Sequence, residues 1–131
     1  MTRRGRGTRL HGVQKATAER LRSYRERVRR LAAQLAETGF LVKGSVIRHY
    51  ARCGNPGCRC QTDPAQRHGP YYRWSTKVGG KTVSRHLSDE EGRLYSEWIA
   101  DRRRVREILR QIERVSEKAA DIILEGERSR S

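Results

Sequence analysis

The chain has 131 residues, a formal net charge of +15 and a sequence pI near 10.9. Only 34% of the residues are hydrophobic and 34% are charged, which excludes two independent apolar cores. No apolar run reaches the roughly 18 residues that cross a bilayer, and no apolar stretch follows the basic N-terminus as in a secretory signal. We therefore expect one cytoplasmic domain with additional terminal segments. Association with the nucleoid is compatible with this expectation.

The positive charge is concentrated in two segments. Residues 1–16 carry five Lys and Arg side chains and no acid, and residues 43–88 carry nine against one acid, Asp63. Residues 89–131 are nearly balanced, with ten basic and eleven acidic side chains. A solvated surface normally mixes both signs, so this segregation predicts an anionic partner.

The first 39 residues predict an arm followed by a helix. Residues 1–16 are rich in Arg and Gly, and we expect a disordered arm. Its Arg3, Arg4 and Arg6 would lie along phosphates or in a minor groove, or would only solubilise the chain. Over residues 17–39 apolar side chains recur at spacings of three and four, which predicts a helix with Thr17 as its cap and a left-handed Gly39 at its end. The apolar positions are Leu21, Tyr24, Val28, Leu31 and Leu35.

Residues 44–88 change to the period of a β-sheet. Residues 45–52 are rich in β-branched and aromatic side chains and predict a strand. Residues 71–78 and 81–87 flank Gly79-Gly80, a strong signal for a two-residue hairpin. That turn would pair Thr76 with Val83, Trp74 with Arg85 and Tyr72 with Leu87 on an apolar face, and Ser75 with Ser84, Arg73 with His86 and Lys77 with Thr82 on the other. We expect a three-stranded antiparallel sheet with its apolar face covered by a helix.

The C-terminal third predicts a long helix over residues 89–126, followed by a disordered tail at 127–131. Ser88 and Glu91 form a capping box, and Leu94 and Trp98 can pack on the sheet. Such a helix would be roughly 55 Å long, more than the sheet can cover. Its distal half therefore needs the first helix folded back as an antiparallel, coiled-coil-like pair, or a second copy of the chain. The distal apolar seam is Val105, Ile108, Ile112, Val115, Ala119 and Ile122.

Three cysteines and a histidine predict a metal site. Cys53, Cys58 and Cys60 lie in one polar turn, and His68 follows eight residues after the last of them. An odd number of cysteines without an export signal argues against disulfides, and three thiolates with one imidazole are a common structural ligand set for Zn²⁺. The other interpretation is of ordinary cysteines in a turn. Alternatives to His68 as the fourth ligand are His49, His86 and Asp63.

The polar face of the hairpin is the candidate nucleic-acid-binding surface. Lys, Arg and hydroxyl donors at alternate strand positions suit phosphates, and a β-ribbon can enter a major groove. A solvated outer face is the plainer interpretation, and Tyr71 could instead stack on an unpaired base. The candidate residues in the middle segment are Arg48, Arg52, Tyr71, Arg73, Ser75, Lys77, Lys81, Thr82, Ser84 and His86.

Two resemblances follow from these motifs. Residues 44–115, with the pattern Gly-Ser…Arg-Cys-Gly-x-Pro-x-Cys-Arg-Cys…His-Gly-Pro-Tyr-Tyr, resemble a family of short, uncharacterised bacterial proteins. Residues 44–100 also resemble, at the level of fold, the arm-type DNA-binding domain of phage tyrosine recombinases, which lacks the cysteine insertion. The second resemblance implies that Arg73, Ser75 and Lys77 contact DNA. The catalytic domain of that family has no counterpart in this chain.

We therefore expect an α+β protein, with two long helices beside a zinc-stapled sheet, that binds nucleic acid, with DNA preferred to RNA. The alternative is a protein–protein adaptor or an RNA-bound accessory subunit that docks on a larger nucleoprotein complex, alone or as a homodimer. We do not expect an enzyme, because no paired carboxylates, Ser-His-Asp set or phosphate loop is recognisable.

Overall fold

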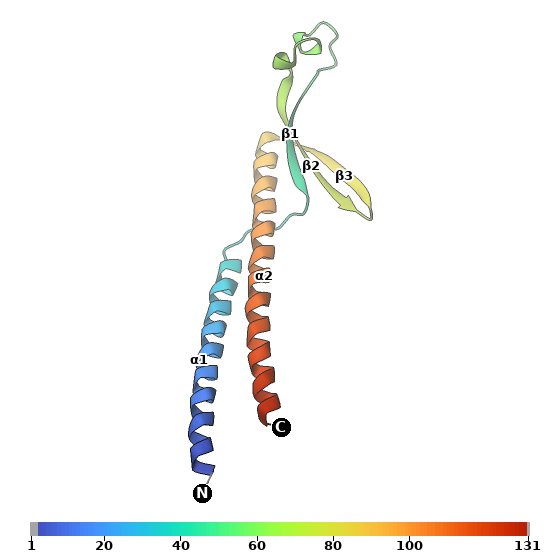
Figure 1. Ribbon diagram of the computed structural model, residues 1–131. Coiled ribbons are helices and arrows are strands. Elements are labelled where there is room, and N and C mark those ends of the chain that lie inside the picture. The colour runs from blue at the N-terminus through green and yellow to red at the C-terminus, as the bar shows by residue number, and fades with distance from the viewer. Residues whose placement is uncertain (1–2, 131) are drawn as a thin grey trace. The chain divides into compact units, whose positions relative to one another are not determined.

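The computed structural model describes residues 3–130, and it describes the surroundings of the side chains from residue 14 to 129. Helix α1 (Arg3–Leu35) is followed by strand β1 (Ser45–Ala51), the 3-10 turns η1 (Arg59–Gln61) and η2 (Pro64–Gln66), strands β2 (His68–Val78) and β3 (Lys81–Leu87), and helix α2 (Asp89–Arg130) (Figure 1). The fold is α+β, as predicted. No helix in the part of the chain described here has the length and apolar character of a membrane span.

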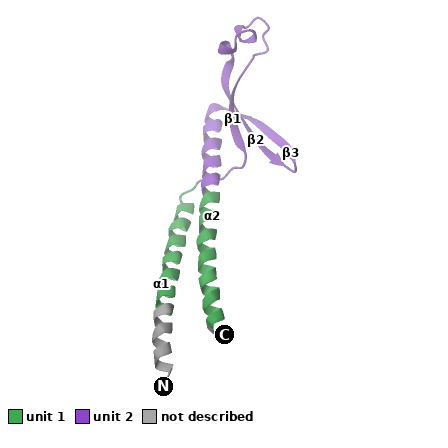
Figure 2. Ribbon diagram, in the orientation of Figure 1, with its two compact units in different colours: residues 1–38, 105–131 green, residues 39–104 purple. Residues whose placement is uncertain are grey.

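The chain divides into two compact units (Figure 2). The helical unit consists of residues 1–38 and 105–131, and the sheet unit consists of residues 39–104. Helix α2 contributes its first turns to the sheet unit and the remainder to the helical unit.

The helical unit is held by the apolar seams of α1 and of the distal part of α2. Leu31, Ile108, Val115 and Ile122 are buried, and the other seam positions are half-buried. The two helices line an apolar groove of about 410 Å³. The sequence predicts that the distal seam of α2 packs on the first helix or on a second copy of the chain. In the structure it packs on the first helix, α1.

Helix α1 differs from the predicted helix at both ends. It begins at Arg3, so the segment predicted to be disordered is helical from that residue, because the Arg, Leu and Gln residues between its glycines are good helix formers. It ends at Leu35, whose carbonyl accepts hydrogen bonds from the amide and the hydroxyl of Thr38. Gly39 does not adopt the predicted left-handed conformation; its amide donates to Asp101 Oδ2 at 3.1 Å.

The sheet has the strand order β1-β2-β3, with both neighbouring pairs antiparallel. The hairpin register is confirmed, because all six predicted cross-strand pairs of β2 and β3 are present. Gly79 and Gly80 both have positive φ angles, 56° and 80°, as a type I′ turn requires.

The first turns of α2 cover one face of this sheet, the covered face, which carries Tyr72, Trp74 and Leu87. The capping box is confirmed: Glu91 N–H donates to Ser88 Oγ at 3.2 Å, and Ser88 N–H donates to Glu91 Oε1 at 3.0 Å. Gly92 lies against the Tyr72 ring, and the Tyr95 and Trp74 rings are 5.7 Å apart. The cover stops before the hairpin tip, where Val78 is 59% exposed, so the prediction of a covered face holds for only part of the sheet.

Candidate metal centre and basic sheet face

The loop between β1 and β2 brings the three cysteines and His68 together. Cys53 follows β1, Cys58 and Cys60 belong to η1 and its cap, and His68 opens β2. A turn in which Cys58 N–H donates to Asn55 O at 3.1 Å reverses the chain between the first two cysteines. The Gln61 side-chain amide then donates to Cys53 O at 2.7 Å, which ties η1 to the end of β1.

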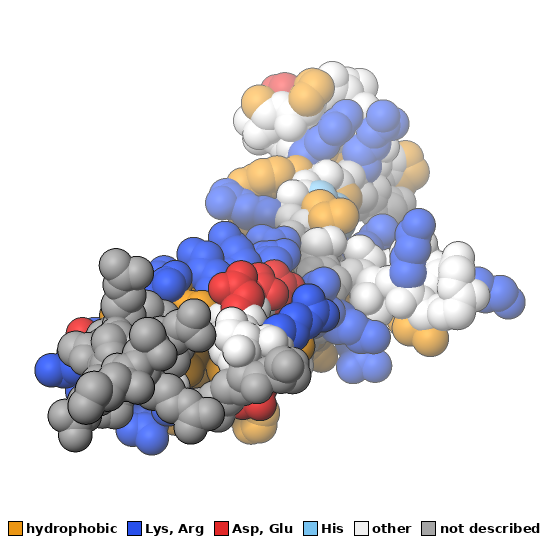
Figure 3. Space-filling view, turned by 60° about the horizontal axis from the view of Figure 1, so that its bottom comes forward, with side chains coloured by type: hydrophobic (Ala, Val, Ile, Leu, Met, Phe, Trp, Pro, Cys, Tyr) orange, Lys and Arg blue, Asp and Glu red, His pale blue; other side chains and the backbone are white. Residues whose placement is uncertain are grey.

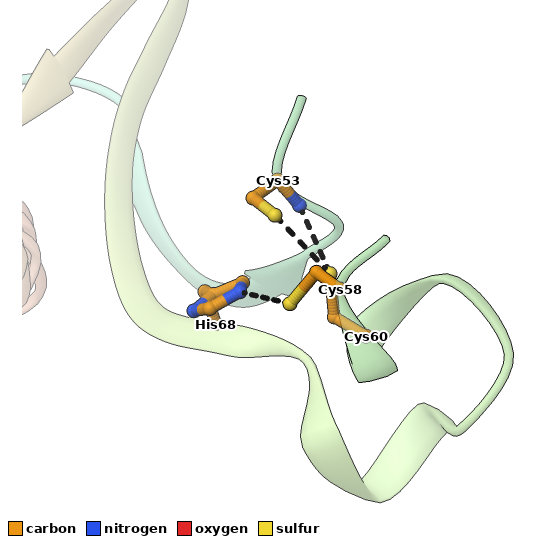
Figure 4. Close-up of side chains that lie close together, drawn as sticks. All are labelled: Cys53, Cys58, Cys60 and His68. Atoms are coloured by element: carbon orange, nitrogen blue, oxygen red, sulfur yellow. Dashed lines mark hydrogen bonds between the residues drawn. The ribbon is translucent and has the colours of Figure 1, made fainter. Parts of the chain in front are cut away.

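The four side chains point toward one another, as Figure 4 shows. Their ligand atoms all lie within 4.8 Å of one another. Cys58 Sγ is 3.3 Å from His68 Nε2, and Cys60 Sγ is 3.5 Å from Cys53 Sγ. A tetrahedral metal with bonds of about 2.0–2.3 Å holds its ligand atoms about 3.3–3.8 Å apart, so the cluster can hold a metal ion with little adjustment.

The surroundings of the thiols favour negative charge on one of them. The backbone amide of Cys60, followed by His68 and the other two thiols, lowers the pKa of Cys58 to about 6. The amide of Cys53 also favours a thiolate at Cys60, but burial and the neighbouring thiols outweigh it and raise the pKa of Cys60. Cys60 is only 1% exposed. A divalent cation would offset the repulsion among three thiolates at this spacing.

The alternative fourth ligands lie elsewhere in the sheet unit. The Asp63 carboxylate accepts a hydrogen bond from Ala65 N–H at 3.0 Å and so caps η2. His49 and His86 line a hollow on the sheet. Among the described residues, the cluster therefore combines the cysteines with His68, the ligand that the spacing favoured.

The face of the sheet opposite α2, the open face, collects most of the predicted nucleic-acid-binding residues. Side chains alternate along a strand, so the register assigns each residue to a face. Lys and Arg side chains are widespread on the side of the molecule seen in Figure 3. The open face comprises Ser45, Ile47 and His49 of β1, Tyr71, Arg73, Ser75 and Lys77 of β2, and Thr82, Ser84 and His86 of β3.

Arg52, which follows β1, lines a hollow at one end of this face. The other predicted residues are not on it. Arg48 pairs with Tyr72, so it lies on the covered side, where its guanidinium donates to the Tyr50 hydroxyl at 2.9 Å. Lys81 pairs with Val78 at the hairpin tip. The side chains of Arg3, Arg4 and Arg6 in α1 lie outside the described ones.

A hollow of about 480 Å³ opens at one end of the open face. The His49 and Tyr71 rings in it are 5.8 Å apart. The hollow is lined by His49, Arg52, Tyr71, Arg73 and His86, and also by Ala51 and by Tyr72 and Leu87 of the covered face. The sequence does not predict that His49 lines this hollow. A long loop separates β1 from β2, so no short-range pattern indicates that His49 pairs with Tyr71. Ala51 in the hollow's lining pairs with His68, so the hollow adjoins the cysteine–histidine cluster.

The fold and the site define a small α+β protein with a candidate metal centre at the end of a three-stranded sheet. A family model described as a domain of unknown function, DUF6788, matches residues 21–96, and the chain belongs to this family. The matched region contains the cysteine–histidine cluster and the open face. Comparisons with curated proteins and with solved structures find no match.

Proposed function

We propose that this protein binds nucleic acid through the open face, with DNA preferred to RNA, and that a Zn²⁺ ion at the cysteine–histidine cluster fixes the end of that face. The observation that carries the proposal is the register, which aligns Arg73 and Lys77, both exposed, with hydroxyl donors on the face opposite α2. The only acid among residues 43–88, Asp63, is occupied as a cap of η2.

The chemistry of the open face suits phosphates. Arg73 can form two parallel hydrogen bonds to one phosphate, Lys77 supplies a second positive charge, and Ser75, Thr82 and Ser84 offer neutral donors. A two-stranded ribbon such as β2–β3 has the width of a DNA major groove. The fold-level resemblance to the arm-type domain of tyrosine recombinases supports the same surface.

The ligand set favours Zn²⁺ and a structural role for it. Soft thiolates with one imidazole suit Zn²⁺ better than the hard cations that prefer oxygen ligands. Four protein ligands form a closed shell, which fits a site that stabilises folding. The ion would join the loop after β1 to the first residue of β2, and so hold the strands that carry the hollow.

The test is the affinity for fluorescent DNA and RNA, measured by anisotropy as the salt concentration is raised from about 50 to 200 mM. The variant Arg73→Ala/Lys77→Ala is expected to bind about 10-fold more weakly and to reduce the salt slope by about 2, because each residue contacts a phosphate. The control Arg103→Ala/Lys118→Ala removes the same charge from exposed positions of α2 and should change affinity less than about twofold. No binding at low salt, or equal weakening by the two variants, would refute the proposal.

A further inference from the structure

We infer that the hollow on the open face receives an unpaired nucleotide, whose base stacks on Tyr71 while its phosphate lies against the neighbouring Arg side chains. This inference rests on the proposed function and names the form of nucleic acid that the hollow takes. It concerns single-stranded segments, of DNA or of RNA, as ligands of the hollow.

The open face is not uniformly basic. Ile47 of the edge strand β1 is 52% exposed and pairs with Arg73, and Tyr71 of the central strand β2 is 45% exposed and pairs with His49 of β1. The phosphates of a duplex gain little from exposed apolar and aromatic side chains, whereas a nucleobase has an apolar face that can cover them. The part of the open face around Ile47 and Tyr71 therefore suits the stacking of a nucleobase.

The hollow supplies the other half of the recognition. Arg52 and Arg73 belong to its lining, together with His86, so cationic donors adjoin the Tyr71 ring within one concavity. Its volume of about 480 Å³ leaves room for a nucleotide. Proteins that bind single strands combine such a cationic surface with aromatic side chains on which bases stack.

A base inside a duplex is stacked on both sides and cannot reach Tyr71 without being extruded. The duplex can contact only the charged and hydroxylated part of the face, around Ser75 and Lys77. Loss of the Tyr71 ring should therefore weaken binding of single strands and leave duplex binding nearly unchanged.

The test measures affinity for a deoxycytidine strand, a cytidine strand, a strand of the same length without bases, and a duplex. Tyr71→Ala and Tyr71→Leu are expected to weaken binding of the two base-containing strands about 10-fold, whereas Tyr71→Phe keeps the ring and should bind within about twofold of the wild type. Tyr50→Ala is the matched control, since Tyr50 is 50% exposed but hydrogen-bonds Arg48 on the covered side. The difference in affinity between the deoxycytidine and cytidine strands shows whether the protein prefers deoxyribose or ribose.

The strand without bases makes the test independent of any folding defect. The wild type should bind it about 10-fold more weakly than the base-containing strand, and Tyr71→Leu should lose most of that difference. Equal affinities of Tyr71→Leu and the wild type for base-containing strands, or an equal loss for the duplex, would overturn the inference while leaving the proposed function intact. A wild type that binds none of the probes would overturn both.

Discussion

At the scale of single residues, the cysteine–histidine cluster depends on four side chains that three separate segments supply. Cys53 is positioned by the end of β1, and His68 by the start of β2. The 3-10 turn η1 positions Cys60, whose Sγ also accepts a hydrogen bond from Cys53 N–H at 3.3 Å. Loss of one ligand would therefore affect both strands as well as the metal.

The first prediction concerns the identity of the fourth ligand. The wild type purified from cells should hold about one equivalent of zinc, and Cys60→Ala and His68→Ala should hold far less, because each removes one of four ligands. His86→Ala should keep its zinc, since His86 lines the hollow and lies outside the cluster. Metal content is measured by plasma mass spectrometry. Full zinc in His68→Ala, or its loss in His86→Ala, would contradict the assignment.

Sequence reasoning reached part of this site. The spacing of Cys53, Cys58 and Cys60 indicated a metal cluster, because three cysteines so close together in a polar turn are hard to explain by packing. The spacing also favoured His68 as the fourth ligand, with His49 as one alternative, and the register of β1 against β2 places His49 beside Tyr71 instead. The same register decides that Arg48 faces away from Arg73.

At the scale of elements, α2 packs closely against the covered face of the sheet at Gly92. A Cβ atom at Gly92 would meet Tyr72 Cγ at 2.7 Å, close to the stem of that side chain. At Gly126, in the same helix, such an atom would have no neighbour within 4 Å among the described side chains and the backbone of other elements. The two glycines therefore form a matched pair for testing this packing.

Gly92→Ala is expected to lower the free energy of unfolding by about 1–3 kcal/mol, because the new methyl group must displace Tyr72 or α2. Gly126→Ala should raise it by up to about 1 kcal/mol, because alanine is the better helix former. Urea unfolding is followed by far-UV circular dichroism and by Trp fluorescence, which reports on the sheet unit because Trp74 and Trp98 both belong to it. A stabilised Gly92→Ala variant would show that α2 is not held closely against β2.

Local patterns predicted the hairpin and the start of α2 well, because both are set by short-range rules. The Gly79-Gly80 turn fixes the register of β2 and β3, and Ser88 with Glu91 fixes the first turn of α2. Short-range rules do not predict how much of the sheet α2 covers. The alternation that marks Val83 as a covered-face residue does not show how far along the hairpin a helix reaches, and its side chain remains 41% exposed.

At the scale of the whole molecule, one continuous helix serves two units with separate apolar contacts. Composition predicted a modest core and an anionic partner. The length of α2 predicted that only its first part packs on the sheet and that its distal seam, from Val105 on, has another partner, and the boundary between the two units falls at that residue. The sheet unit, residues 39–104, contains both the cysteine–histidine cluster and the open face, to which the proposed functions are assigned.

The most direct test of the central claim, that the open face binds nucleic acid, is an amide-resolved NMR titration of the zinc-loaded, ¹⁵N-labelled protein with a short single strand and with a duplex. The shift changes should concentrate at Tyr71, Arg73, Ser75, Lys77, Thr82, Ser84 and His86. The seam residues of the helical unit should change little. Changes confined to the helical unit, or no changes at saturating concentrations at low salt, would contradict the account.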